Sequence, residues 1–216
     1  MKVIVTIFVL TTAAAFPGSG QVNLDEIRTL TTDTSSRYYY DTLLVDFLRH
    51  PEEFEVTKAI TLYYGKLYSR FYKPYHFGED EVAFDELVKR ENYSRAITVG
   101  ERILERDPVN LAVLLKLLKC YFETKEQSLA DLTRVKARVL HNAILKSGSG
   151  EQESSPLRVI AIADEYAVLG LMDVKLLTRS SQVYPASVMD RWKVQPKQGK
   201  KKEVWFEVLL NKEAFN

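Results

Sequence analysis

Residues 59–75 restrict the fold more than any other stretch, because tyrosine and phenylalanine recur in it at helical spacing. At 3.6 residues per turn, its large apolar side chains fall on two adjacent stripes of one helix. The stripes consist of Tyr63, Leu67 and Phe71, and of Tyr64, Tyr68 and Tyr72. The opposite arc carries Lys58, Lys66, Ser69 and Arg70, which predicts a water-facing side. A helix with about half of its circumference apolar must pack against other elements, so we place it at the centre of the fold.

The aromatic rings allow two interpretations. The first is a core in which the rings are buried and their hydroxyl groups reach its rim. The second is a groove for a sugar or a peptide, because tyrosine offers a flat apolar face with a polar tip. We favour the core, and we expect Tyr38, Tyr72 and Tyr75 to be the rings that stay partly open.

The first twenty residues have the pattern of a secretory signal peptide. Lys2 supplies a positive start, residues 3–10 are an apolar run, and residues 13–15 are three alanines. We expect cleavage between Ala15 and Gly20, export to the periplasm or the cell exterior, and no integral membrane segment in the mature chain. Cleavage removes Lys2, so 29 basic side chains remain against 29 acidic ones. The mature chain then has no net positive charge to attract a nucleic acid, and no nucleic-acid partner is expected.

Hydrophobic periodicity predicts an α+β fold, with helices first and strands near the end of the chain. After a short amphipathic segment over residues 22–32, helices are expected over residues 36–48, 57–73, 79–87, 93–106, 111–122, 129–146 and 164–172. Extended segments are expected over residues 157–162, 174–178, 192–194 and 204–208. The last two predict an antiparallel hairpin in a small C-terminal antiparallel sheet, with Val204, Phe206, Val208 and Leu210 facing the helices.

Two patterns suggest how the chain is divided. Residues 92–130 resemble one helical hairpin of a tetratricopeptide repeat, because an Asp-Pro-x-Asn turn separates two helical periods. No further unit follows at that period, so we expect the pair to pack within one bundle. The composition changes at residues 147–156, which predicts a linker between a helical bundle (residues 21–146) and an α+β subdomain (residues 157–216) packed on it.

Several short motifs occur in a fixed order along the chain. They are Tyr38-Tyr39-Tyr40 followed by Leu43, Leu44 and Phe47, then Leu62-Tyr63-Tyr64-Gly65, Tyr72-Lys73-Pro74-Tyr75, the glycine-rich link, Asp164-Glu165-Tyr166 and Ser181-Gln182. Together they resemble a family of small exported Bacteroidetes proteins described only as a domain of unknown function. The resemblance implies export and a bacterial source, but no reaction and no catalytic residue. The chain departs from the resemblance at Asp173, where a glycine is expected after the short helix.

Signatures of catalysis are missing from the sequence. It has no Gly-x-Ser-x-Gly, no His-Glu-x-x-His, no phosphate-binding glycine loop, and one cysteine, Cys120, which we expect to be buried. We expect His50 and His141 to be surface or packing residues, and no cofactor or metal. His76 lies near the acidic residues 79–81 and could help to hold a cation, although we favour a solvated helix N-terminus there.

The Asp164-Glu165-Tyr166 motif places two carboxyl groups beside a phenol, a set that suits acid–base chemistry. Neighbouring side chains on a helix point about 100° apart, so the two carboxyl groups are not expected to share a site. We favour Asp164 as a helix cap, Glu165 in the first turn and Tyr166 in the core. Gln182 could belong to a polar pair at a strand edge.

Two functions fit these observations. The first is a non-enzymatic module that binds a protein or a peptide through the helical pair and the aromatic rim. The alternative is a small periplasmic hydrolase or transferase that uses Asp164, Glu165 and His76. The candidate binding residues are Tyr38, Tyr64, Tyr68, Tyr72, Tyr75, His76, Asp164, Glu165, Tyr166 and Gln182. A deep pocket with convergent carboxylates would favour the enzyme, and a shallow groove or exposed patch the module.

Overall fold

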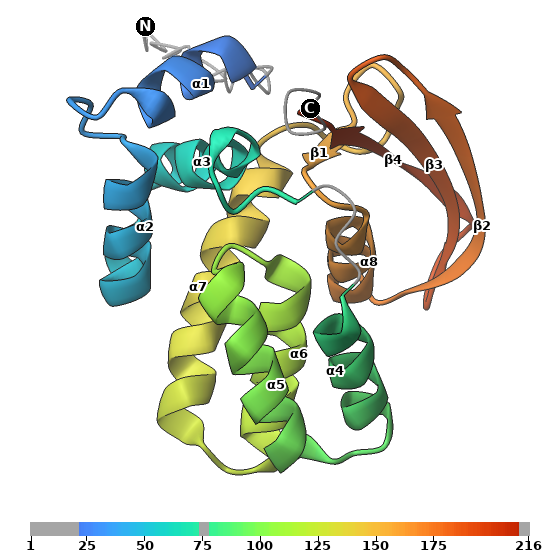
Figure 1. Ribbon diagram of the computed structural model, residues 1–216. Coiled ribbons are helices and arrows are strands. Elements are labelled where there is room, and N and C mark those ends of the chain that lie inside the picture. Colours follow the sequence, from blue (N-terminus) through green and yellow to red (C-terminus); the bar gives the residue numbers. More distant parts are fainter. Residues whose placement is uncertain (1–21, 74–77, 212–216) are drawn as a thin grey trace, which may run out of the picture.

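A computed structural model describes residues 22–73 and 78–211. This part of the chain forms an α+β fold, as the sequence predicts, with seven α-helices before the first strand and an eighth after it (Figure 1). The helices are α1 (Leu24–Thr32), α2 (Tyr40–Arg49), α3 (Val56–Gly65), α4 (Glu79–Lys89), α5 (Tyr93–Arg106), α6 (Leu111–Glu123), α7 (Gln127–Leu145) and α8 (Ile162–Leu171). The strands are β1 (Leu157–Val159), β2 (Val174–Val183), β3 (Ser187–Pro196) and β4 (Lys202–Leu209).

The aromatic stretch forms α3 and one turn of 3₁₀-helix, η2 (Lys66–Tyr68). Tyr63 and Tyr64 are fully buried, which confirms the core interpretation for these two rings. The predicted helix is too long, because Ser69 ends it. The Ser69 hydroxyl group donates to the Lys66 carbonyl and accepts from the Phe71 N–H, so it replaces helical hydrogen bonds.

Lys66 contradicts the predicted water-facing arc, because it is buried. Its ammonium group donates to the Val109 carbonyl over 2.9 Å and lies 2.5 Å from a carboxylate oxygen of Asp107. A buried ammonium group needs such partners, since water no longer solvates it. Lys66 therefore joins the end of α3 to the turn between α5 and α6.

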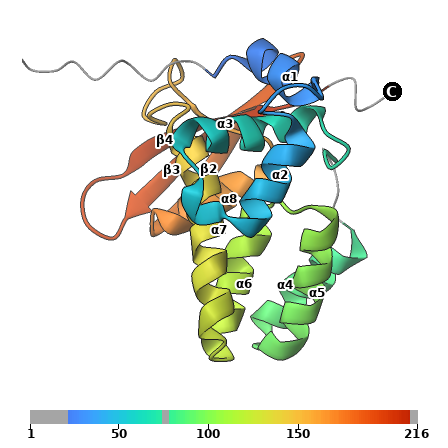
Figure 2. The ribbon, with the colours of Figure 1, turned by 90° about the vertical axis from the view of Figure 1, so that its left-hand side faces the viewer.

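The helical hairpin predicted from residues 92–130 consists of α5 and α6, and its boundaries follow the sequence pattern closely. Asn110 caps α6, since its side chain accepts from the Val113 N–H over 3.1 Å. The hairpin packs with α4 around a second cluster of apolar side chains, which includes Phe84, Ile103 and Leu117. Figure 2 shows α6 and α7 running side by side below α3. The likeness to a tetratricopeptide repeat stays a prediction.

The strands form one curved sheet in the order β1-β4-β3-β2, with α8 on its concave side (Figure 1). The β3–β4 hairpin is present, and Val204, Phe206 and Val208 are buried, as predicted. The expectation of a purely antiparallel sheet is wrong, because β1 lies parallel to β4 with Leu157 opposite Phe206. No tight turn joins β1 to β4, so nothing forces them to run antiparallel.

Residues 147–156 form a hydrogen-bonded loop between α7 and β1. The Gly150 N–H donates to the Ser155 carbonyl, and the Gly150 carbonyl accepts from the Trp205 N–H, each over 2.8 Å. One apolar core continues from α3 and α7 across this loop to β1 and β4. The division into a bundle and a subdomain stays a prediction.

Two glycines give a matched test of this packing. A Cβ atom on Gly148 would lie 2.1 Å from the Pro156 carbonyl oxygen, whereas one on Gly170, near the end of α8, would have no neighbour within 4 Å. Gly148→Ala should lower the free energy of unfolding by about 1–3 kcal/mol, because backbone must move. Gly170→Ala should raise it by about 0.5–1 kcal/mol through helix propensity. Chemical denaturation measures both, and a shift of the same sign in the two variants would contradict the loop geometry.

Candidate functional site

The two carboxyl groups of α8 lie in different surroundings, as the helical spacing predicts. Asp164 accepts a 2.6 Å hydrogen bond from the Tyr63 hydroxyl group, which in turn accepts from the Ile160 N–H over 3.2 Å. Glu165 instead accepts from the indole N–H of Trp192 over 2.9 Å. The pair therefore does not converge on one substrate position.

Two details of the predicted α8 are wrong. Ala161, not Asp164, is the N-cap residue, and Asp164 lies inside the first turn of the helix. Tyr166 is not in the core, because 48% of it is exposed. Its ring meets the Trp192 ring edge-on at 5.2 Å between centroids.

Burial dominates the chemistry of Asp164. It raises the pKa of this carboxyl group to about 6, although the Tyr63 hydroxyl group and the Lys66 charge both favour the ionised form. Asp164 and Tyr72 line a partly enclosed cavity of about 190 Å³. The cavity brings together two of the residues that the sequence marked as candidates.

A second polar cluster lies between α8 and the strands β2 and β3, and sequence analysis marked only two of its members, Glu165 and Ser181, without bringing them together. Asp190 and Glu165 are both fully buried. Asp190 receives hydrogen bonds from the Arg179 guanidinium group over 2.5 Å and from the Ser181 hydroxyl group. Arg179 also lies 5.6 Å from the centre of the Trp192 ring. The pairing of β2 with β3 brings these side chains together, because Arg179 is opposite Trp192 and Ser181 is opposite Asp190. A correct prediction of this pairing would have revealed the cluster.

Glu165 and Asp190 share one proton. Burial and the hydrogen bond to Asp190 raise the pKa of Glu165 to about 8, whereas the pKa of Asp190 is lowered by Arg179, Glu165 and Ser181 against the effect of burial. Oε1 of Glu165 is buried and has no hydrogen-bond partner among the described residues, which disfavours a charge on this carboxyl group. At neutral pH the cluster therefore holds a protonated Glu165 beside an ionised Asp190.

The candidate tyrosines do not form one site. Tyr64 donates to the Arg158 carbonyl over 3.0 Å, while the Tyr68 ring lies beside Arg28 and the partly buried Tyr38 ring beside Arg37. The expectation that Tyr72 stays open is wrong, because only 7% of it is exposed. The hydroxyl group of Tyr72 accepts from the Asn211 N–H, which draws this ring into the core. Tyr75 and His76 lie outside the described residues.

Strand β2 has a free edge that is longer than the sequence pattern predicts. It is the last strand in the sheet order, and all ten of its residues are exposed or half-exposed. Its predicted length, residues 174–178, was too short, because the polar run Thr178 to Gln182 hides the strand period. Gln182 is opposite Met189 and belongs to this strand, which agrees with its expected place at a strand edge.

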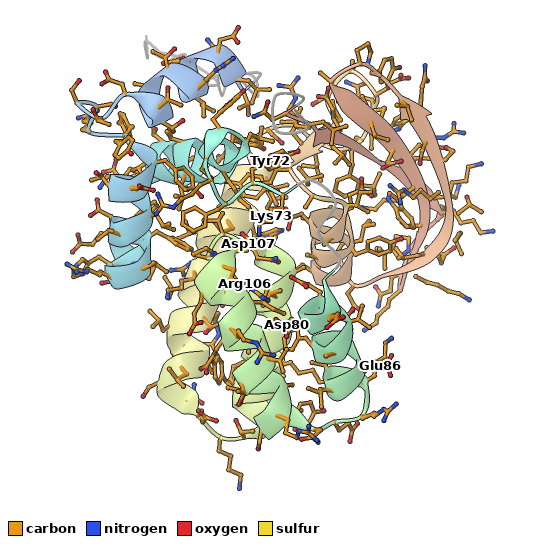
Figure 3. The ribbon with its side chains drawn as sticks, in the orientation of Figure 1. Tyr72, Lys73, Asp80, Glu86, Arg106 and Asp107 are labelled. Atoms are coloured by element: carbon orange, nitrogen blue, oxygen red, sulfur yellow. The ribbon has the colours of Figure 1, made fainter. Side chains whose placement is uncertain are left out.

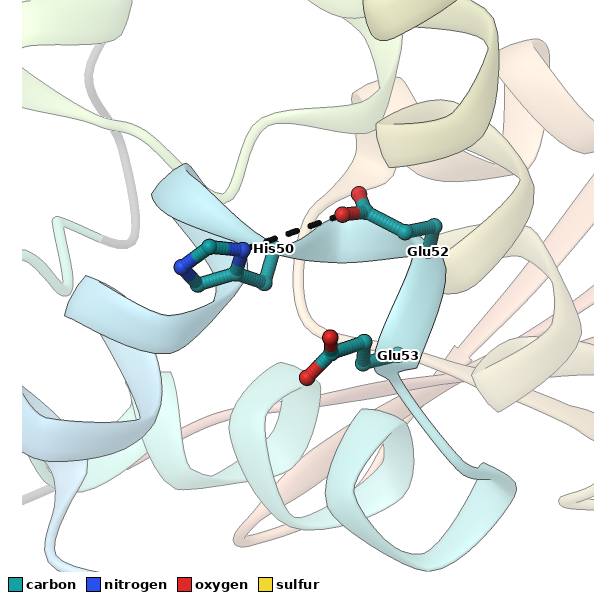
Figure 4. A group of neighbouring side chains, drawn as sticks. All are labelled: His50, Glu52 and Glu53. Carbon is teal, nitrogen blue, oxygen red and sulfur yellow. Dashed lines mark ion pairs between the residues drawn. The ribbon is translucent and has the colours of Figure 1, made fainter.

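Two further groups of charged side chains have a composition that could attract a cation. His50, Glu52 and Glu53 approach one another after α2 (Figure 4), but all three are exposed, and the His50 ring lies 3.8 Å from a Glu52 oxygen. Exposed, hydrated side chains of this kind are not held in place for an ion. Of the acidic residues 79–81, Asp80 is paired with Arg102 and Arg106 of α5 at 2.5 Å each. Asp80 and Arg106 are labelled in Figure 3.

Substituting Glu165 tests the shared proton. An unfolded Glu165 ionises near 4.5 and the folded one near 8, so unfolding releases a proton between these values and stability falls as pH rises. Asp164 causes a similar fall in stability, but mostly below pH 6, because the pKa of its folded carboxyl group is about 6. In Glu165→Gln the fall in the free energy of unfolding between pH 6 and pH 8 should be absent, as measured by denaturation at a series of pH values. Glu203→Gln, on the outer face of β4, is the control for loss of a carboxylate. If stability still fell between pH 6 and pH 8 in Glu165→Gln, the shared proton of Glu165 and Asp190 would be refuted.

Of the helices within residues 22–73 and 78–211, none combines the length and the apolar composition needed to span a bilayer. No curated protein and no solved structure matches the chain. One family does match, over residues 25–214, which is nearly the whole chain. The match agrees with the resemblance found in the sequence motifs. The chain belongs to the family described as Domain of unknown function (DUF4919).

Proposed function

We propose that the protein is an exported, non-enzymatic binding module that takes an extended acidic segment of a partner protein as an additional strand beside β2. The observation that carries this proposal is the free edge of β2, a strand of ten residues. A free edge offers a row of unpaired N–H and C=O groups, and peptide-binding domains use such rows to add a strand. The proposal of export rests on the signal-peptide pattern of residues 1–20.

The register identifies the backbone groups that would bind. The Tyr184 N–H donates to the Ser187 carbonyl over 2.8 Å, which sets the alternation along β2. In an antiparallel pair every second residue bonds to the neighbouring strand, and the residues between them point their backbone groups the other way. Ser181 and Val183 therefore direct their N–H and C=O groups toward the free edge.

The side chains around this edge favour an acidic segment. β2 carries Lys175 but no acidic residue, and Lys193 projects from the neighbouring strand. The charge of Arg179, also on β2, is already paired with Asp190. The exposed apolar side chains Leu176, Leu177 and Val183 offer contacts for alternate side chains of a docked strand. Charge complementarity would align the partner and exclude basic segments.

The geometry gives less support to the alternative, a small periplasmic hydrolase or transferase. Asp164 hydrogen-bonds to Tyr63 and Glu165 to Trp192, so the two carboxyl groups do not act on a common substrate atom. His76, the third residue of that hypothesis, lies outside the described residues.

Strand addition is tested at Val183, 77% of which is exposed. The probe is a ten-residue peptide of alternating glutamate and valine, and calorimetry measures its affinity for the whole mature chain. Val183→Pro should weaken binding about tenfold, because an outward N–H is lost and the proline ring obstructs the docked strand. Val183→Thr keeps the shape and the N–H group and should bind like the native chain.

Three binding results would refute the proposal, and a fourth result concerns the oligomeric state. The binding results are equal affinity of Val183→Pro and the native chain, equal affinity for a peptide with lysine in place of glutamate, and no binding of either peptide. A dimer that Val183→Pro dissociates would also refute it, because a second copy of this chain would then occupy the edge.

A further inference from the structure

The cavity beside Asp164 lies where four parts of the chain meet. Its lining comes from the segment after α3, from α4, from the turn between α5 and α6, and from the start of α8. Figure 3 labels Tyr72, Arg106 and Asp107, which belong to this lining. A cavity of about 150 Å³ can hold benzene, so about 190 Å³ is enough for a slightly larger molecule.

The charges of the lining are not all paired. The lining contains four cationic and four acidic side chains: Lys66, Lys73, Arg106 and Lys116, and Glu81, Asp85, Asp107 and Asp164. Lys66 is paired with Asp107, Lys116 with Asp85, and Arg106 with Asp80 of α4. The remaining cation, Lys73, is exposed. Two carboxyl groups, Glu81 and Asp164, form no ion pair with any described residue.

One of these carboxyl groups keeps a buried oxygen atom without a donor. Oε2 of Glu81 is buried and has no partner within the described part of the chain. Asp164 is only 4% exposed, and the Tyr63 hydroxyl group donates to its Oδ2 atom. A buried carboxylate oxygen without a donor is unfavourable, so Glu81, beside the buried Asp164, indicates a missing cationic or donor partner.

The rest of the lining suits an apolar body. Phe71, Tyr72 and Phe84 contribute aromatic rings, and Val82 and Ile162 contribute aliphatic side chains. Aromatic faces also attract an ammonium group. The start of α8 would favour an anion through its dipole, but the carboxyl group of Asp164 already lies in that first turn.

We infer that this cavity binds a small primary ammonium compound with an apolar body, with Asp164 as the acceptor for its N–H groups and Glu81 as a second negative charge. This site is separate from the edge of β2, and it stands or falls independently of strand addition. It assigns a role to Asp164, the carboxyl group of α8 that does not belong to the cluster of Glu165, Asp190 and Arg179.

Three ligands of one shape test the charge preference. Cyclohexylammonium, cyclohexanol and cyclohexanecarboxylate are titrated into the full mature chain at pH 8 and followed by calorimetry. At this pH the Asp164 carboxyl group, whose pKa is about 6, is ionised. Cyclohexylammonium should bind at least about tenfold more tightly than the alcohol, and the carboxylate should bind least.

Substitutions of Asp164 and Glu81 test whether these residues cause the preference for ammonium over alcohol. Asp164→Asn keeps a carbonyl oxygen for Tyr63 and should remove the preference for ammonium over alcohol. Glu81→Gln should weaken ammonium binding about threefold, which also serves if Asp164→Asn fails to fold. Glu105→Gln removes an exposed charge from α5, away from the lining, and should bind like the native chain.

Each other result overturns the inference. Equal binding of alcohol and ammonium means that the cavity recognises only apolar bodies, and tighter binding of the carboxylate means that it is an anion site. Binding of none of the three means that the cavity holds only water. An undiminished preference in both Asp164→Asn and Glu81→Gln would place the ammonium group elsewhere.

Discussion

The hydroxyl groups of Tyr63 and Tyr64 fix α3 to the elements that follow residue 156. Tyr63 donates to Asp164 and accepts from the Ile160 N–H, and Tyr64 donates to the Arg158 carbonyl, so α3 is bonded to β1 and to the start of α8. Both rings are fully buried, so each hydroxyl group must find a partner inside the protein. Apolar packing alone would let the sheet slide on the helices, whereas directional bonds at three points define one position. The aromatic helix is therefore both the centre of the core and the element that orients α8.

The parts of this arrangement that local pattern determines were predictable. The boundaries of α5 follow from its apolar period, and the burial of Val204 and Phe206 follows from strand alternation. Polar residues in buried places were not predictable, because their burial depends on partners distant in the sequence. Lys66 was expected in water, yet its partners Asp107 and Val109 are about forty residues away, a separation that no local period reports.

Asp173 shows that a backbone conformation can be predictable where the residue that adopts it is not. The sequence resemblance leads one to expect glycine where Asp173 stands, and Asp173 has a φ of 52°, in the left-handed region that glycine adopts most easily. The backbone expectation thus holds although the residue differs. Aspartate tolerates this region better than most residues, and here its carboxylate also lies 2.5 Å from the exposed ammonium group of Lys197.

The buried cluster of Glu165, Asp190 and Arg179 explains how a long edge strand can remain ordered. β2 has no neighbour on its outer side, and few of its side chains are covered, so strand pairing with β3 is its main support. Arg179 and Ser181 add side-chain bonds from β2 to Asp190 of β3, and Glu165 extends the network to α8. These side chains point to the concave face, while the backbone groups of the same stretch point to the free edge. An exposed edge strand ordinarily invites aggregation, which a bulge at Leu177 and the positive charge of Lys175 oppose. The charge that repels a second copy of β2 attracts an acidic strand, so protection and recognition can rest on the same residue.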